Sequence, residues 1–192
     1  MRAASEQVVL LDPEGRPCGV ADKATVHGRT TPYHLAFSCY VFDEAGRFLV
    51  TQRAHTKVTW PGIWTNSCCG HPGPAEDPRD AVLRRLRQEL GIGVDRLLLA
   101  LPDFSYRASF RGVEEYELCP VFLARTSAEP NPDPDEVAAA AWWQWSDFVT
   151  AALAPDSGIS PWAQEQVRQL DSSGHVAHFL AEESSDQSAC SR

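Results

Sequence analysis

The stretch GHPGPAEDPRDAVLRRLRQELGI, residues 70–92, contains a short loop and a helix whose two ends are both marked. Asp77 can accept hydrogen bonds from the first free backbone N–H groups, and Pro78 suits the first helical position. Gly91 can adopt the left-handed conformation that ends a helix. The apolar stripe between them consists of Val82, Leu83, Leu86 and Leu90. The sequence therefore predicts one well-defined helix that begins at Pro78 and ends before Gly91.

Strands are predicted on both sides of this helix. They are Val8–Asp12, His34–Phe42, Phe48–Arg53, Glu115–Ala124 and Ala141–Trp145. A second capped helix is expected from Ser160-Pro161 to about Leu170, and the proline-containing segment 127–135 predicts a loop. This order predicts a single α+β domain over residues 1–170, with a mixed sheet flanked by helices. Residues 171–192 are rich in Ser, Asp and Glu, which predicts a flexible tail.

Composition and charge limit the classes of function. The chain has 192 residues, a net charge of -9 and 43% hydrophobic residues, so we expect no general attraction for nucleic acid or anionic lipid. It lacks an apolar signal segment and any run long enough to span a membrane, which favours the cytoplasm. Six cysteines without a CxxC pair indicate neither a disulfide framework nor a structural zinc knot. An anionic substrate must then be held by local cations or by bound metal.

The run TNSCCGHP, residues 65–72, places two adjacent cysteines before His71. A metal site, a disulfide and a catalytic thiol are the possible interpretations. Adjacent cysteines seldom meet disulfide geometry without strain. If the run is extended, Cys69 and His71 share one side and Cys68 faces the other, because side chains alternate along a strand. Cys68 is then an ordinary core residue, and Cys69 is the one that would join a site.

The strand around residues 114–120 carries two carboxylates on one side. Alternation points Glu115, Glu117 and Cys119 one way and the residues between them the other way. Carboxylates about 7 Å apart along a strand repel each other. Water offsets this repulsion at a solvated edge, and a metal ion offsets it in a pocket. The residues alone leave both interpretations open.

A single histidine or basic residue is weak evidence for a functional site, because most such residues lie at the surface or have hydrogen-bond partners in the core. The histidines are His27, His34, His55, His71, His175 and His178. The basic candidates are Lys23, Arg53, Lys57 and Arg85. Three arginines near Glu89 on one helix of an acidic chain are compatible with a phosphate site.

Together these segments resemble the type I isopentenyl diphosphate isomerases, a divergent branch of the Nudix superfamily. The resemblance spans about Val8 to Leu170 and is carried by HLAFS (His34–Ser38), WPGIWTNSCCGHP (Trp60–Pro72), DAVLRRLRQELG (Asp80–Gly91), YRAS (Tyr106–Ser109), EEYELCPVF (Glu114–Phe122) and SPW (Ser160–Trp162). It implies a Nudix-like fold and the interconversion of isopentenyl diphosphate and dimethylallyl diphosphate in isoprenoid biosynthesis.

The helix departs from the pattern of Nudix hydrolases, which bind water-activating divalent ions with clustered glutamates. Residues that fit the pattern are Gly70, Glu76, Arg84, Leu86, Glu89, Gly91 and Ile92. Arg85 and Gln88 stand where two further glutamates are expected. Losing two carboxylates should weaken a hydrolytic site, and the isomerase branch shares this departure.

The isomerisation adds a proton to an alkene and removes another through a carbocation, so the site must exclude water. The resemblance implies that Cys69 exchanges a proton on one face of the substrate and Glu117 on the other, assisted by Tyr106. It also implies one Mn²⁺ or Zn²⁺ ion, whose ligands would be His27, His34, His71, Glu115 and Glu117.

The diphosphate needs its own anchor. The resemblance implies a Mg²⁺ ion that bridges the diphosphate to Glu89, with cations supplied by Lys23, Arg53, Lys57 and Arg85. Trp162 would lie beside the carbocation, where a desolvated cation–π contact is worth about 2 kcal/mol or more. The expected partner is the small-molecule substrate alone, and the chain is expected to be a monomer.

Three alternatives compete with this interpretation. A Nudix diphosphate hydrolase would release phosphate or pyrophosphate from nucleotides, and Arg85 and Gln88 argue against it. A silent Nudix-fold binding module would lack proton-transfer or metal residues, yet all of them are present. A redox sensor built on Cys68 and Cys69 would leave the histidines and glutamates unexplained.

Overall fold

The computed structural model describes residues 6–182, and those residues form two sheets. The smaller sheet has the order β2-β1-β3-β10-β9, and the larger has the order β12-β5-β4-β11-β8, with β6 paired to β5 and β7 to β4. The smaller sheet consists of β1 (Gln7–Leu11), β2 (Pro17–Asp22), β3 (His34–Leu35), β9 (Ser105–Phe110) and β10 (Val113–Leu118). The larger consists of β4 (Phe37–Phe42), β5 (Phe48–Arg53), β6 (Trp64–Thr65), β7 (Cys68–Gly70), β8 (Arg96–Leu101), β11 (Val121–Arg125) and β12 (Val137–Trp143).

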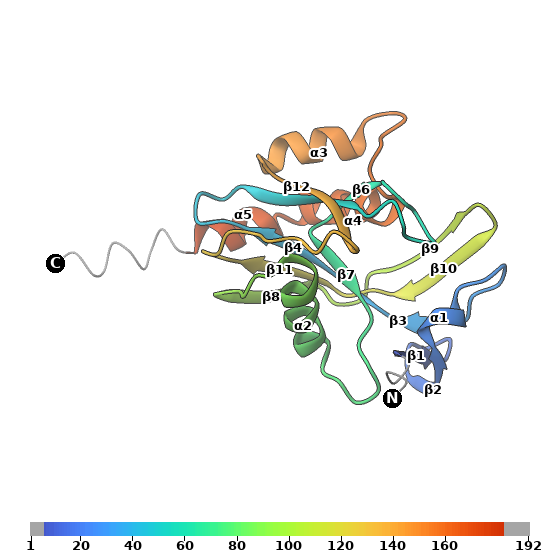
Figure 1. The fold of residues 1–192 in the computed structure, drawn as a ribbon. Helices are drawn as coiled ribbons and strands as arrows, with labels where there is room; N and C mark the ends of the chain where they lie inside the picture. Colours follow the sequence, from blue (N-terminus) through green and yellow to red (C-terminus); the bar gives the residue numbers. More distant parts are fainter. Residues whose placement is uncertain (1–5, 183–192) are drawn as a thin grey trace.

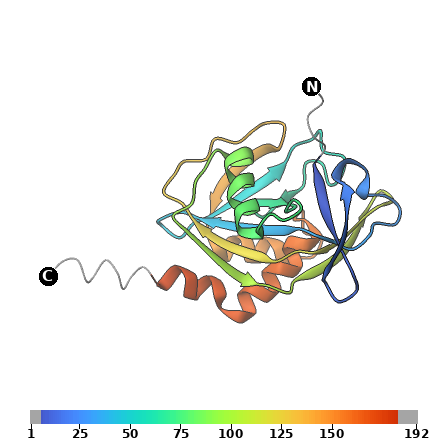
Figure 2. The same cartoon turned by 90° about the horizontal axis from the view of Figure 1, so that it is seen from below.

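Helices cover both faces of the larger sheet (Figure 1). The helices on the larger sheet are α2 (Pro78–Leu90), α3 (Trp145–Leu153), α4 (Pro161–Ser173) and α5 (His175–Ala181), whereas α1 (Lys23–Val26) contacts β1 and β2 of the smaller sheet. The helix α2 lies on one face, whereas α3, α4 and α5 lie on the other, as the view in Figure 2 also shows. Because both faces are covered, every residue of β4 is buried and the strand is almost continuously apolar. The expected α+β class with flanking helices is confirmed.

The segments His34–Phe42 and Glu115–Ala124, expected as single strands, are each divided between the two sheets. In the smaller sheet β3 pairs with β10, and in the larger sheet β4 pairs with β11, both in parallel. The two segments therefore pass from one sheet to the other side by side. In the second segment the break falls at Cys119-Pro120, where proline has no N–H group for a ladder hydrogen bond. The short β3 thus carries His34 away from the sheet that holds the rest of its segment.

The predicted central helix is confirmed at both ends. Asp77 accepts a hydrogen bond from the N–H of Arg79 at 2.8 Å, and Gly91 ends α2 with a φ of 66°. The buried face holds Val82, Leu86 and Leu90, as expected, but also the charged pair Arg85 and Glu89. Leu83 is only partly buried. One end of the buried face is therefore polar.

The C-terminal elements differ from the expectation. The last expected strand is longer and earlier, as β12, and Trp145 begins α3. The helix α4 continues to Ser173, and α5 follows within the segment expected to be a tail. Val176 and Phe179 of α5 are buried, which explains its order despite the polar composition around it. Residues 183–192 lie outside the described part of the chain. No described helix has the length and apolar character needed to cross a membrane.

Candidate active site

A cavity of about 320 Å³ is lined by side chains from both sheets and from α1, α2 and α4. All but one of the residues expected in a site line this cavity. They are Lys23, His27, Arg53, Lys57, Cys69, His71, Arg85, Glu89, Tyr106, Glu115, Glu117 and Trp162. The exception, His34, is fully buried and contacts the cavity residue His71. Residues scattered over the sequence are therefore brought together by the fold.

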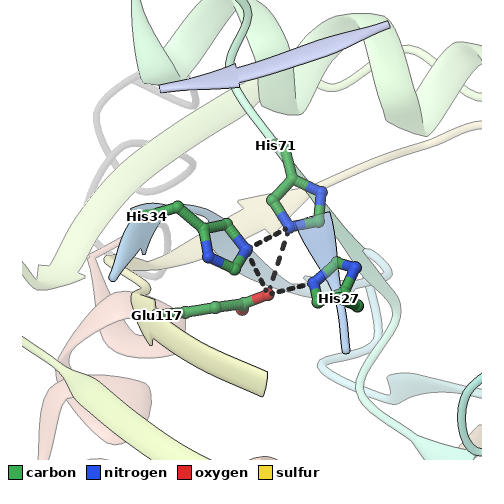
Figure 3. Close-up of side chains that lie close together, drawn as sticks. All are labelled: His27, His34, His71 and Glu117. Atoms are coloured by element: carbon green, nitrogen blue, oxygen red, sulfur yellow. Dashed lines mark hydrogen bonds and ion pairs between the residues drawn. The ribbon is translucent and has the colours of Figure 1, made fainter. Parts of the chain in front are cut away.

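Four possible metal ligands converge at this cavity (Figure 3). His27 follows α1, His34 lies in β3, His71 follows β7 and Glu117 lies in β10. Glu117 Oε1 lies 3.1 Å from His71 Nε2, 3.3 Å from His34 Nε2 and 3.8 Å from His27 Nε2. All four ligand atoms lie within 4.8 Å of one another. The parallel register, which sets His34 opposite Glu117, creates this convergence.

Hydrogen bonding decides which nitrogen of His34 faces the cluster. Its Nδ1 lies 2.8 Å from the carbonyl oxygen of Pro32, so Nδ1 carries a proton, and in the neutral ring Nε2 keeps a lone pair. That lone pair faces His71 Nε2 at 3.2 Å as well as the carboxylate of Glu117. His27 Nε2 is buried without a hydrogen-bond partner. Converging lone pairs repel each other but fit a cation, so the four side chains could hold a divalent metal ion.

The electrostatics separate the two glutamates of β10. Burial opposes ionisation of Glu117, yet the three imidazoles close to its carboxylate favour the charged form and hold its pKa well below the ordinary value. Burial, together with the charge of Glu117, raises the pKa of Glu115. Burial lowers the pKa of His71 to about 4, so this imidazole is neutral and able to bind metal at pH 7. For His34, burial is outweighed by the hydrogen bond and charge of Glu117, and the pKa rises.

Tyr106 joins the two glutamates. Its hydroxyl lies 3.0 Å from Glu115 Oε2 and 2.9 Å from Glu117 Oε2. Burial, reinforced by these carboxylates, raises the pKa of Tyr106 well above its ordinary value, so the hydroxyl keeps its proton. The glutamates are only 7% and 5% exposed, which excludes the solvated-edge interpretation. Glu115 lies beside the converging ligand atoms and contacts Glu117 through Tyr106.

The two cysteines face opposite sides of the larger sheet. Cys68 belongs to the core beneath α2, whereas Cys69 packs against the core beneath α3, α4 and α5. The expected alternation is confirmed, and both thiols are free. Cys69 Sγ lies 3.2 Å from Asn66 Oδ1 and 3.4 Å from Ser38 Oγ. Burial raises the pKa of Cys69 to about 11, although these hydrogen bonds lower it, so Cys69 is a protonated thiol at neutral pH.

The cavity also gathers cations. Lys23, Arg53, Lys57 and Arg85 come from four different segments of the chain. The Nε of Arg53 is buried without a hydrogen-bond partner. Lys57 forms an ion pair with Glu136, and Arg85 Nη2 lies 3.2 Å from the same carboxylate. A partly buried group of cations of this kind suits a diphosphate, because each phosphate oxygen accepts charge-assisted hydrogen bonds.

Glu89 is the carboxylate of α2 that lines the cavity. Arg85 Nε donates to its Oε1 at 2.8 Å. Burial nevertheless raises the pKa of Glu89, and Glu136 adds to this rise. Two carboxylates beside a group of cations offer the oxygen ligands that Mg²⁺ prefers.

Glu76 and Arg84, which fit the Nudix pattern, do not line the cavity and instead bind each other. Arg84 donates to both oxygens of Glu76, with distances of 2.7 Å and 2.8 Å, and Gly73 N–H donates to Glu76 at 2.8 Å. These bonds close the loop before α2. Gln88 is exposed, and Arg85 enters the cavity as a cation. The helix therefore lacks the acidic cluster of a hydrolase, as the sequence predicted.

An aromatic wall limits the access of water. Trp162 is 3% exposed, and its ring centroid lies 5.9 Å from that of Tyr106 and 5.7 Å from that of Trp60. The indole N–H donates to Asn66 Oδ1 at 3.0 Å, and the guanidinium of Arg53 lies 6.0 Å from the ring centroid. The π face of such a ring can stabilise a cation.

Among the further residues that line the cavity, Asn66 and Glu136 contact predicted site residues, and sequence reasoning did not assign them a role. Asn66 accepts hydrogen bonds from both Cys69 and Trp162. Its position in the run TNSCCGHP could have indicated a role in the site, but that role depends on Trp162 of α4, far along the chain. Glu136 follows a proline-containing loop, and no local pattern distinguishes it from the acidic residues around it.

The comparisons with known proteins agree on family and fold. The NUDIX domain family matches residues 32–163. A protein of Saccharopolyspora erythraea named isopentenyl-diphosphate Delta-isomerase is 57% identical over 166 residues, covering 86% of this chain and 86% of that protein. Proteins of the same name from Frankia alni and Mycolicibacterium vanbaalenii are 53% and 56% identical, covering 91% and 88% of this chain and 89% and 94% of those proteins.

Solved structures show the same fold at lower identity. DR0079 from Deinococcus radiodurans has a TM-score of 0.67 at 18% identity, covering 85% of this chain and 98% of that one. The MutT protein from Methanosarcina mazei Go1 has a TM-score of 0.60 at 18% identity, covering 74% and 96%. Likeness at this level of identity concerns the fold alone.

Proposed function

The chain belongs to the isopentenyl-diphosphate Delta-isomerases of the NUDIX domain family, and we propose that Cys69 and Glu117 exchange the protons of this isomerisation. The enzyme interconverts isopentenyl diphosphate and dimethylallyl diphosphate. One observation supports the assignment most strongly. A thiol that keeps its proton and a carboxylate that loses it easily line the same buried cavity as the four basic side chains.

The division of labour follows from the chemistry of an alkene. A very weak base needs an acid held close to it, and binding energy from the diphosphate can supply this positioning. We infer that Lys23, Arg53, Lys57 and Arg85 hold the diphosphate, while Trp162 and Tyr106 cover the hydrocarbon end. Cys69 and Glu117 then exchange one proton each, and Tyr106 donates a hydrogen bond to Glu117. The roles of Cys69 and Glu117 reverse with the direction of the reaction.

Metal ions support the carboxylates in this proposal. A Mn²⁺ or Zn²⁺ ion held by His27, His34, His71, Glu115 and Glu117 would fix the catalytic carboxylate and weaken its affinity for protons. Glu89 would hold the Mg²⁺ ion that accompanies the diphosphate. The monomeric state and the cytoplasmic location expected from the sequence stay predictions, and light scattering tests the first.

Proton NMR of the purified protein with isopentenyl diphosphate and Mg²⁺ in heavy water tests the proposal. We expect the terminal alkene signals to be replaced by dimethylallyl signals, with deuterium in the product. In Cys69→Ala, and separately in Glu117→Gln, this exchange should nearly stop. If both variants isomerise the substrate at the wild-type rate, the residue roles are wrong. Release of phosphate or pyrophosphate in place of isomerisation would instead support a hydrolase.

A further inference from the structure

The thiol of Cys69 contacts two buried polar side chains, Asn66 and Ser38. The other hydrogen bonds of Asn66 determine which atom donates in its contact with Cys69. Asn66 Nδ2 donates to the carbonyl oxygens of Cys39 at 3.1 Å and Cys68 at 2.8 Å. The amide is thereby fixed with Oδ1 toward Cys69, and an amide oxygen only accepts. The 3.2 Å contact is therefore a hydrogen bond donated by the thiol. The single hydrogen of Cys69 is directed at Asn66 Oδ1, which also accepts from Trp162 Nε1 at 3.0 Å and Thr65 Oγ1 at 2.9 Å.

A chain of buried side chains ends on the same sulfur from another side. Tyr40 donates its hydroxyl hydrogen to Gln166 Oε1 at 2.9 Å, and Gln166 Nε2 donates to Ser38 Oγ at 2.9 Å. Ser38 Oγ lies 3.4 Å from both Cys69 Sγ and Cys119 Sγ. The hydrogen bond from Tyr40 orients the amide of Gln166, so that Gln166 Nε2 faces Ser38 and donates to it.

The hydroxyl of Ser38 has one hydrogen to give and two lone pairs that accept. Gln166 uses one lone pair, and the thiol of Cys119 can use the other. Because the hydrogen of Cys69 points at Asn66, Ser38 is the donor in its contact with Cys69, and this arrangement is complete when the thiol of Cys119 donates to the second lone pair of Ser38. Ser38, Tyr40 and Gln166 are 0% exposed, and none of them lines the cavity. Ser38 can therefore influence the substrate only through residues that line the cavity, and it contacts two of them, Cys69 and Cys119.

We propose that Ser38, oriented by Gln166 and Tyr40, is a positioning residue for proton transfer at Cys69. The inference rests on the proposed acid–base role of Cys69. When the S–H bond breaks and a C–H bond forms on the substrate, the electron pair left on sulfur already accepts the Ser38 hydrogen bond. When sulfur takes a proton back, Asn66 accepts the hydrogen bond of the new thiol. The sulfur of Cys69 therefore has a hydrogen-bond partner both with and without its proton. It needs no water molecule beside it, and water would trap the carbocation.

The first test is the steady-state kinetics of Ser38→Ala. A hydrogen bond to a group that becomes charged is worth a factor of about 10 to 100, so kcat should fall by about that much. KM should stay within about twofold, because Ser38 does not touch the substrate. Thr126→Val is the matched control. Thr126 is 1% exposed, its hydroxyl donates to the Gly93 carbonyl at 2.7 Å, and it does not line the cavity. This control should keep the wild-type kcat.

A second variant separates positioning from folding, because Ser38→Ala leaves the Gln166 amide buried without an acceptor. The triple variant Ser38→Ala/Gln166→Leu/Tyr40→Phe replaces the whole chain by apolar groups of similar shape, which is close to neutral for folding. Its thermal stability should recover while kcat stays low. The infrared S–H band of Cys69, obtained as the difference from Cys69→Ala, should shift in both variants. Recovery of kcat along with stability would overturn the proposal.

Cys69→Ala, measured in parallel, separates failure of the inference from failure of the proposed function. Loss of activity in Cys69→Ala with a wild-type kcat in Ser38→Ala would reject only the role of Ser38. A raised KM with unchanged kcat in Ser38→Ala would reject it as well. Full activity in Cys69→Ala would reject the proposed function itself.

Discussion

At the scale of single residues, neighbours in the sequence have different surroundings. Cys68 and Cys69 are adjacent, but β7 turns them to opposite faces of the larger sheet. Cys68 lies in an apolar core, where burial raises its pKa well above the ordinary value. Cys69 has a hydrogen-bond acceptor and a donor beside its sulfur. The second thiol is therefore equipped for proton transfer and the first is not.

This contrast predicts the behaviour of two alanine variants. Cys69→Ala should lower kcat by about 10²- to 10⁴-fold, the usual contribution of a general acid or base. Cys68→Ala should keep most of the activity and lose about 1 kcal/mol of stability through lost packing. Isomerase assays and thermal unfolding of both variants check this expectation. Loss of activity in Cys68→Ala alone would exchange the assignments.

Glu76 predicts a pH effect on stability. Its hydrogen bonds from Arg84, against the cost of burial, hold its pKa below the ordinary value of 4.5. A folded pKa below the unfolded one stabilises the fold above the unfolded pKa, and this stability is lost as the pH falls through the folded pKa. Wild-type protein should thus be more stable than Glu76→Gln near pH 7, and the difference should shrink below about pH 4.5. Urea unfolding at several pH values measures it, and a constant difference would contradict the argument.

At the scale of elements, α2 depends on the residue that ends it. Gly91 has a φ of 66°, and a Cβ there would lie 3.0 Å from the carbonyl oxygen of Asn131. That oxygen belongs to the segment whose N–H groups at Asn131 and Asp133 donate to the end of α2. The end of the helix and the loop before Glu136 are therefore fixed together.

Gly91→Ala should lower the free energy of unfolding by about 1–2 kcal/mol, because both the left-handed backbone and the close contact oppose a side chain. Gly93→Ala, two residues on, is the control. A Cβ there has no atom within 4 Å, and the residue has no positive φ. Chemical denaturation of both variants tests the difference. Equal stability of the two would show that the cap is unimportant.

The central helix could be predicted because its signals are local. Asp77, Pro78 and Gly91 each act within one turn of where they stand. The division of the two long strands could not be predicted, because it depends on which partner each half finds in space. The helix α5 was missed for a similar reason. Its two buried residues gain stability only from a core formed by distant segments.

The site shows the same limit. The resemblance in sequence pointed to twelve of the residues that line the cavity, because their types and spacing are specific. It gave no sign of the hydrogen-bond chain from Tyr40 to Ser38, since these side chains meet only when α4 packs on β4. The resemblance also grouped Glu115 with the metal ligands; the four converging atoms belong to His27, His34, His71 and Glu117, and the role of Glu115 stays a prediction. A sequence pattern can indicate which residues belong to the site, whereas the orientation of their side chains depends on how the strands and helices pack.

At the scale of the whole molecule, the metal ligands join the two sheets. His34 and Glu117 lie in the smaller sheet, and His71 follows β7 of the larger sheet. A bound ion would therefore link both halves. Something that binds only the folded state stabilises it, by about 2.7 kcal/mol at a concentration 100 times its Kd.

Chelator-treated protein should thus unfold at a lower temperature, and added Mn²⁺ or Zn²⁺ should restore the higher one. His27→Ala should respond less to metal than the wild type. His178→Ala is the control, because His178 lies on α5 and does not belong to the cluster. Scanning calorimetry with and without metal measures the shifts. An equal response of the wild type and His27→Ala would argue against metal binding at these histidines.

The parallel pairs β3–β10 and β4–β11 also set the order in which the enzyme can be completed during its synthesis. Contacts between distant segments form more slowly than local ones, because a long loop must close first. The first strand of each pair leaves the ribosome well before the second exists, whereas α2 lies between them and needs only its own turns. The α4 helix, which supplies Trp162, is made later still. The nascent chain therefore contains all the local contacts of α2 long before it can form an active site, and catalysis can begin only after Trp162 has been translated.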